Sequence, residues 1–259
     1  MSDLILIERD AYGGNGVVKL TLNRPEAFNA LSEAMLDALG RALQDVAASD
    51  ARVVVLAGAG RAFCAGHDLK EMRASPALDY YRDLFARCSR MMLTIQRMPQ
   101  PVIARVHGVA TAAGCQLVAM CDLAVASSDA RFAVSGVNFG LFCATPSVAL
   151  SRNVSRKAAF EMLVTGEFID AATARERGLV NRVASPDALD DAVRTLAGTI
   201  AAKPREAVAA GKGLFYRQLE TGIEAAYALA SETMACNMMD DDALEGTQAF
   251  VEKRAPRWN

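Results

Sequence analysis

Two short, mostly apolar runs constrain the fold of this chain most strongly. They are Val53–Ala57 and Pro101–Val106, and each leads directly into a stretch of small residues. An apolar run without regular polar alternation is typical of a strand that is buried on both faces of a parallel sheet. Parallel neighbours need long crossover connections, which are usually helical. The two runs therefore predict an α/β fold in which strands and helices alternate.

The N-terminal residues fit the same alternation. Leu4–Ile7 and Val17–Leu22 lie on either side of a glycine-rich turn signal at residues 13–16, which predicts a β-hairpin. Ser32 is a candidate N-cap for the first helix. The apolar side chains that follow it at helical spacing are Leu36, Leu39, Leu43 and Val46. These residues predict a helix shortly after the hairpin.

Further helices and strands are expected along the rest of the chain. A long helix is predicted over Asp79–Met98, and a shorter one over Ala113–Cys121. The remaining short strands are expected at Leu123–Ala126 and Arg131–Val134. After about Ser155 the pattern becomes mostly helical. This order predicts an α/β core that is followed by a helical module.

Composition excludes several classes of protein. The chain has 259 residues, of which 52% are hydrophobic, and its net charge is −2. This size allows one large domain, and the charge favours neither nucleic acid nor an anionic membrane as a partner. The N-terminus has no basic segment followed by a long apolar run, so we expect no secretory signal and a cytoplasmic location. The apolar runs are also too short to span a membrane.

The cysteines and histidines point away from disulfides and metals. The six cysteines form no C-x-x-C pair, which favours reduced thiols. Only two histidines are present, His67 and His107, and no cluster of ligands surrounds either of them. We therefore expect no metal site.

The stretches that follow the two apolar runs carry the candidate chemistry. Small residues around Gly66 allow a ligand to approach the backbone closely. The second stretch leads into the expected start of a helix at Ala113, and a helix N-terminus offers unpaired N–H groups. Two such sites that converge on one point would form an oxyanion hole. An ordinary connection between a strand and a helix is the alternative for either stretch alone.

Four motifs together resemble the crotonase (enoyl-CoA hydratase/isomerase) superfamily. They are Asn23–Leu31, Val53–Met72, Pro101–Asp122 and Glu245–Arg254, in the order found in that family. The resemblance implies a ClpP/crotonase-like spiral of ββα units over residues 1–200. It also implies a C-terminal helical trimerisation region over residues 201–259, with assembly as a homotrimer or a dimer of trimers.

The resemblance also implies roles for individual residues. The oxyanion donors would be the backbone N–H groups of His67 and Ala113, and the substrate would be an acyl-CoA thioester. Coenzyme A would enter as part of the substrate, without a separate cofactor. The residues that match coenzyme A contacts in the family are Ala27, Ala65, Asp68, Leu69, Lys70, Phe250 and Lys253.

Two positions depart from the family's pattern. Typical hydratases hold water between two carboxylates, one acting as base and the other as acid. The matching positions here are Gln116 and Gly136. A glutamine amide is not a general base at neutral pH, and a glycine has no side chain. By resemblance the chain is an enoyl-CoA hydratase, a lyase, but these residues predict weak hydration.

Other functions remain open from the sequence. Residues 65–68 with Val137–Asn138 resemble the methylmalonyl-CoA decarboxylase branch, in which loss of CO₂ generates the enolate directly. Asn138 would then bind a substrate carboxylate, or it only stabilises a turn. Residues 110–119 with Gly140–Cys143 resemble the subgroup of enoyl-CoA hydratase domain-containing protein 3. Another enolate-dependent lyase or isomerase, or a non-catalytic acyl-CoA-binding protein, are further alternatives.

Overall fold

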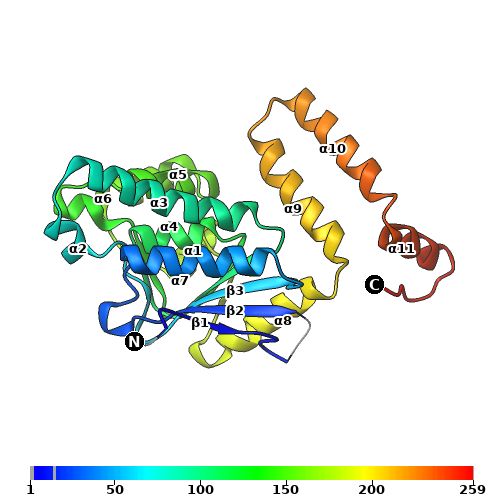
Figure 1. Cartoon of the computed structure of the whole chain (residues 1–259), viewed down its shortest axis with the longest axis horizontal. Coiled ribbons are helices and arrows are strands. Elements are labelled where there is room, and N and C mark those ends of the chain that lie inside the picture. Colours follow the sequence, from blue (N-terminus) through cyan, green and yellow to red (C-terminus); the bar gives the residue numbers. More distant parts are fainter. Residues whose placement is uncertain (1–2, 14–15, 259) are drawn as a thin grey trace.

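The computed structural model describes residues 3–13 and 16–258, and strands alternate with helices as predicted (Figure 1). The strands of the larger sheet, in spatial order, are β1 (Ile5–Glu8), β2 (Val17–Leu22), β3 (Val53–Gly58), β5 (Val102–Val106), β7 (Leu123–Ser127) and β10 (Arg182–Ala184). β1 and β2 are antiparallel and form the predicted hairpin, while the other neighbours are parallel. Gly14 and Asn15 of the predicted turn lie outside the described residues.

A smaller sheet contains the other strands. Their spatial order is β4 (Ala62–Cys64), β6 (Val109–Thr111), β8 (Arg131–Ala133) and β9 (Ile169–Asp170). The chain passes from the larger to the smaller sheet three times, through β3–β4, β5–β6 and β7–β8. This is a spiral of ββα units, as expected. The residue pattern did not predict β4 and β6 individually, because strands of three residues are too short to show a periodicity.

Helices cover both faces of the larger sheet. α1 (Glu33–Ala47) and α3 (Leu78–Arg97) lie on one face, and α8 (Leu189–Ala201) lies on the other. In β3, the side chains of Val54 and Leu56 pack on the α1 side, whereas those of Val53 and Val55 pack on the α8 side. This double burial explains the continuous apolar run. The Ser32 hydroxyl accepts a hydrogen bond from the Met35 N–H, which confirms the predicted N-cap.

The core contains further helices and short 3₁₀ turns. The helices are α2 (Leu69–Ala74), α4 (Ala113–Met120), α5 (Ala144–Asn153), α6 (Arg156–Thr165) and α7 (Ala171–Glu176). Short 3₁₀ turns lie at η1 (Pro25–Ala27), η2 (Ser135–Phe139) and η3 (Pro186–Ala188). The sequence did not predict α2 and α5. α2 has six residues, and α5 carries a proline in its first turn and only a few buried side chains.

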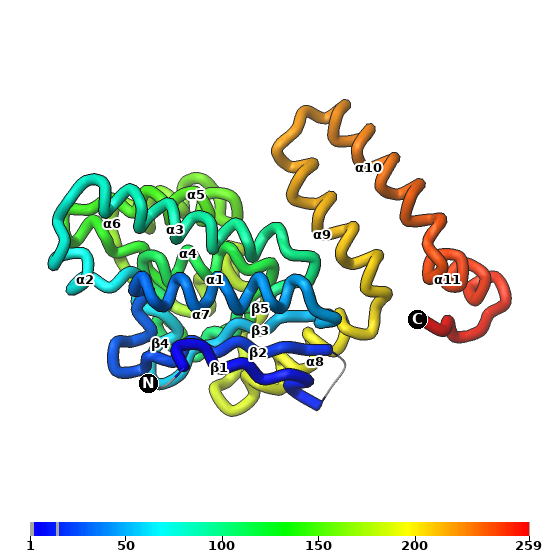
Figure 2. The backbone as a smooth tube through the Cα atoms, viewed as in Figure 1, coloured from blue at the N-terminus to red at the C-terminus, as the bar shows by residue number. Residues whose placement is uncertain are grey.

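Three C-terminal helices extend away from this core (Figures 1 and 2). They are α9 (Arg205–Leu219), α10 (Ile223–Asn237) and α11 (Asp241–Val251). The buried ammonium of Lys212 fixes α9 to the core. It donates to the carbonyls of Ile95 and Gln100 at 2.8 Å each and pairs with Asp122 at 2.7 Å. The trimerisation role of residues 201–259 stays a prediction.

Among the described helices, none is both long and apolar enough to cross a membrane.

Candidate active site

The two small-residue stretches meet at glycines. β4 and β6 are parallel neighbours, so the residues that follow them lie at the same edge of the smaller sheet. Gly66 has a positive φ of 94°, and a β-carbon there would lie 3.0 Å from the Ala112 β-carbon and 3.3 Å from the Ala113 nitrogen. On Gly114, a β-carbon would overlap the Cys64 carbonyl oxygen. Only glycine allows these backbones to approach so closely.

The amides of His67 and Ala113 are left unpaired by the backbone. His67 forms an isolated β-bridge with Leu31. The Leu31 N–H donates to the Gly66 carbonyl and the Asp68 N–H donates to the Leu31 carbonyl, so the N–H of His67 takes no part in the bridge. Ala113 is the first residue of α4, whose first helical bond runs from Gln116 N–H to Ala112. Within the described residues, neither amide has a backbone acceptor. Both residues line one pocket.

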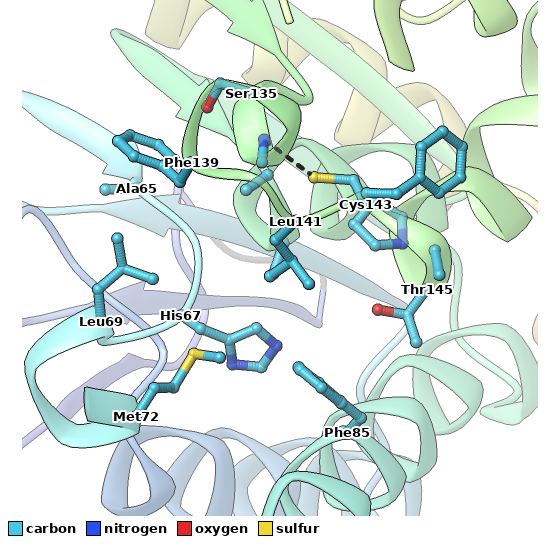
Figure 3. A pocket seen from close by; sticks show the side chains of 16 residues that line it. Ala65, His67, Leu69, Met72, Phe85, Ser135, Phe139, Leu141, Cys143 and Thr145 are labelled. Carbon is cyan, nitrogen blue, oxygen red and sulfur yellow. Dashed lines mark hydrogen bonds between the residues drawn. The ribbon is translucent and has the colours of Figure 1, made fainter. Parts of the chain in front are cut away.

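This pocket has a volume of about 300 Å³, and its walls are largely apolar (Figure 3). α2 and α3 form one side, and η2 with the start of α5 forms the other. The large apolar side chains in the lining are Leu69, Met72, Phe85, Phe139, Leu141, Phe142 and Pro146. No aspartate, glutamate, lysine or arginine belongs to the lining formed by the described residues. The pocket therefore suits an uncharged acyl group.

The backbone leaves no space for a side chain at Gly136. A β-carbon there would overlap the Leu141 carbonyl oxygen and would lie 2.7 Å from the Cys143 sulfur. The Gly136 N–H donates to that sulfur at 3.3 Å, and the Leu141 N–H donates to the Gly136 carbonyl at 3.0 Å. The loop therefore fills the space that any side chain at position 136 would need.

Gln116 and Asn138 lie outside the pocket lining. Gln116 is only 5% exposed, and its side-chain oxygen has no hydrogen-bond partner in the described part of the chain. The Asn138 amide donates to the Gly166 carbonyl at 3.4 Å. It therefore holds the turn after α6.

The predicted coenzyme A contacts near the pocket differ in their surroundings. Ala65 and Leu69 line the pocket, whereas Lys70 is exposed on α2 and Ala27 lies in η1. The carboxylate of Asp68 caps α2 by accepting from the N–H groups of residues 70 and 71, and it pairs with Arg24 at 2.7 Å. Burial raises the pKa of Asp68, but these hydrogen bonds lower it by more than burial raises it. The pKa of Asp68 therefore lies below its ordinary value.

The structure does not bring Phe250 and Lys253 to this pocket. Phe250 is 84% exposed on α11, which lies at the opposite end of the molecule from α2 (Figure 1). It lines a different hollow, together with Trp258. Lys253 follows α11. Within one chain, neither residue belongs to the site.

The sequence did not predict most of the apolar wall of the pocket. Phe85 falls within the predicted helix Asp79–Met98, but the sequence did not identify Phe85, Met72 or Phe142 as pocket residues. A signal was present, because Phe139–Phe142 is an apolar segment interrupted only by a glycine that adopts a left-handed conformation. Its phenylalanines are strongly exposed, at 73% and 46%. Exposed aromatic side chains beside a cavity indicate a binding surface.

Comparison with known proteins identifies relatives along nearly the whole chain. The family described as enoyl-CoA hydratase/isomerase matches residues 13–259. The rat protein named enoyl-CoA hydratase domain-containing protein 3, mitochondrial, is 45% identical over 95% of this chain and 82% of its own length. These matches confirm the family and the subgroup that the motifs resemble.

Solved structures agree with this relationship. An enoyl-CoA hydratase from Mycobacterium smegmatis is 69% identical with a TM-score of 0.96, and 98% of each chain is covered. The human enoyl-CoA hydratase domain-containing protein 3 is 43% identical with a TM-score of 0.94, covering 98% of this chain and 100% of that one. These neighbours confirm the expected fold class.

One expectation is wrong. The sequence led us to expect a cytoplasmic location, but the related rat and human proteins are named mitochondrial. The absence of an obvious secretory signal, from which that expectation was drawn, does not distinguish between compartments inside the cell.

Proposed function

The chain belongs to the enoyl-CoA hydratase/isomerase family, and we propose that its pocket binds an acyl-CoA thioester and stabilises the enolate of that thioester. The donors are the backbone N–H groups of His67 and Ala113. The observation that carries this proposal is the close approach of Gly66 to Ala113, which brings both amides to one pocket.

These two amides suit a developing negative charge. The Ala113 N–H lies at the N-terminus of α4, where the helix dipole is positive. Donors fixed in the backbone need no reorganisation when charge develops on the thioester oxygen. Substitution of a side chain leaves these backbone donors in place. Stabilisation of the enolate therefore does not require carboxylates at positions 116 and 136.

Ordinary hydration is expected to be slow. Gln116 and Gly136 replace the two carboxylates, and each general acid or base contributes roughly 10²–10⁴-fold in rate. The loop over Gly136 leaves no room for a side chain. Reactions that form an enolate without a carboxylate base therefore fit this site better than hydration.

Decarboxylation of a malonyl-type thioester is the second candidate. Loss of CO₂ generates the enolate directly, and the lining formed by the described residues contains no carboxylate. The alternative without catalysis is an acyl-CoA-binding protein.

The test compares two substrates with the purified protein. Crotonyl-CoA is followed by its enoyl absorbance, and methylmalonyl-CoA by release of CO₂. We expect slow hydration at most. Rapid hydration would contradict the argument from Gln116 and Gly136, and turnover of either ester would exclude a purely binding role.

Assembly as a homotrimer or a dimer of trimers is part of this proposal. Large apolar side chains are exposed on α9–α11, among them Phe215, Leu219, Ile223, Tyr227, Met234 and Phe250. Exposed apolar surface of this kind indicates contact with another chain. Phe250 and Lys253 would then contact coenzyme A only from a second copy. Light scattering of the purified protein tests the mass of the assembly.

A further inference from the structure

The imidazole of His67 is a polar group without a partner inside an apolar pocket. Its ring lies between the side chains of Met72, Leu141 and Phe85 (Figure 3), and it meets the Phe85 ring edge-on with 5.5 Å between centroids. Both ring nitrogens are buried, and neither has a hydrogen-bond partner in the described part of the chain. Native proteins rarely leave such atoms unsatisfied, and functional sites are among the exceptions.

Among the described residues that line the pocket, no other side chain has an ordinary pKa near neutrality. The Ser135 hydroxyl is 2.9 Å from the Thr111 hydroxyl and forms a hydrogen bond with it. Burial raises the pKa of the Cys143 thiol, although the Gly136 N–H lowers it in part. His67 is therefore the side chain in this lining whose ordinary pKa lies closest to neutrality.

Two polar groups on the neighbouring helices α2 and α3 are hydrogen-bonded to backbone atoms. On α2, the Glu71 carboxylate accepts the Glu33 N–H at the start of α1. On α3, the Tyr81 ring stacks on the Phe85 ring, and the Tyr81 hydroxyl donates to the Met72 carbonyl. Burial lowers the pKa of His67, opposed only in part by the backbone of Leu31. Because the pKa of His67 lies below its ordinary value, the ring is mostly neutral at pH 7, and one of its two nitrogens then carries no proton.

We propose that the imidazole of His67 exchanges a proton with the α-carbon of the bound acyl group, a role that rests on the proposed function above. The ring nitrogen accepts the α-proton as the C–H bond breaks. The electron pair moves into the thioester, whose oxygen accepts hydrogen bonds from the His67 and Ala113 N–H groups. Return of the proton from the imidazolium regenerates the ester, so the step needs no further reactant.

This assignment deepens the proposed function in one respect. It supplies the base that the two missing carboxylates do not, and it places that base on the same residue as one oxyanion donor. Ring and amide are separable by mutation, because a substitution at position 67 removes the imidazole and keeps the backbone N–H.

The test measures deuterium uptake at the α-carbon of butyryl-CoA in D₂O by mass spectrometry. Binding of butyryl-CoA is measured in parallel by calorimetry. The variants are His67→Gln and His67→Ala. If one of them fails to fold, the other still tests the role of the imidazole. His107→Gln is the matched control, since the His107 ring contacts the Gly60 carbonyl at 2.8 Å and is not part of the pocket lining.

We expect the wild type and His107→Gln to exchange, and both His67 variants to lose at least about 100-fold in exchange rate while they still bind the ester. In the wild type, exchange should rise with pH and level off, with a midpoint below 6.5, the ordinary pKa of histidine.

Three results would overturn the assignment. They are exchange retained in either His67 variant, a wild type that binds the ester without exchanging it, and exchange independent of pH between 5 and 8. The first two leave the binding pocket intact as a proposal. A wild type that does not bind butyryl-CoA would remove the proposed function and this inference with it.

Discussion

The Leu141 carbonyl oxygen occupies the space that a β-carbon on Gly136 would need. The hydrogen bonds around it, from Leu141 N–H to Gly136 and from Gly136 N–H to Cys143, hold the loop in this position. The backbone therefore excludes a side chain at position 136, and the loop would have to move before one could be accommodated.

Gly136→Glu is accordingly expected not to restore hydration. Forcing a side chain against backbone atoms costs typically about 1–3 kcal/mol in unfolding free energy. Denaturant unfolding and the crotonyl-CoA assay measure the two effects. A variant with wild-type stability and rapid hydration would show that the loop moves aside with little loss of stability and would contradict this prediction.

Gln116→Glu should behave differently. The two side chains have nearly the same shape, so the substitution creates no overlap on α4. One general base contributes about 10²-fold or more when correctly placed, and we expect hydration of crotonyl-CoA to rise at least about 10-fold. Unchanged hydration at every pH between 6 and 9 would mean that position 116 does not reach the substrate.

Gly114→Ala should disrupt the proposed enolate site and the fold together. The new methyl group would overlap the Cys64 carbonyl oxygen and lie 2.7 Å from its carbon, which displaces the start of α4 and the Ala113 amide. We expect a loss of about 1–3 kcal/mol in stability and weaker binding of butyryl-CoA. Gly40→Ala is the matched control, because nothing lies within 4 Å of a β-carbon there, and it should stabilise α1 by up to about 1 kcal/mol.

Lys212→Met should release α9 from the core. It leaves the buried carboxylate of Asp122 without its ion pair, and removing one partner of a buried pair costs about 3–5 kcal/mol. Lys157→Met, at an exposed lysine of α6, should change stability by less than about 0.5 kcal/mol. Urea unfolding compares the two, and equal stabilities would contradict the anchoring role of Lys212.

Asp68 should make stability depend on pH in the acid range. Its pKa in the folded state lies below the ordinary value of 3.8, mainly through Arg24 and the N–H groups at the start of α2, which outweigh burial. Its contribution is therefore complete above about pH 4 and is lost as pH falls through the lowered pKa. Asp68→Asn should be less stable than the wild type at pH 6, with a difference that shrinks below pH 4. A difference that stays constant from pH 7 to 3 would exclude this linkage.

The sequence by itself determined the buried strands, the main helices and the family. β3 lies between two layers of helices, so both of its faces are apolar. This double burial appears in the sequence as a run of consecutive apolar residues. Ser32 caps α1 through contacts only three residues away. Burial of a strand and capping of a helix can therefore be predicted from residues that are close together in the sequence.

The tertiary structure decided which residues share the pocket. Phe85 comes from α3, whereas Gly136 and Cys143 belong to the loop between β8 and α5, and the meeting of these two segments depends on how the ββα units stack. Phe250 and Lys253 match motif positions for coenzyme A contacts, yet α11 lies far from the pocket of its own chain. The apolar surroundings of the His67 ring come from residues distant in sequence, such as Phe85 and Leu141, whereas the space denied at Gly136 follows from the conformation of the loop between Gly136 and Cys143. Residue identity and spacing report what a segment buries, whereas packing between segments decides what its side chains and amides can reach.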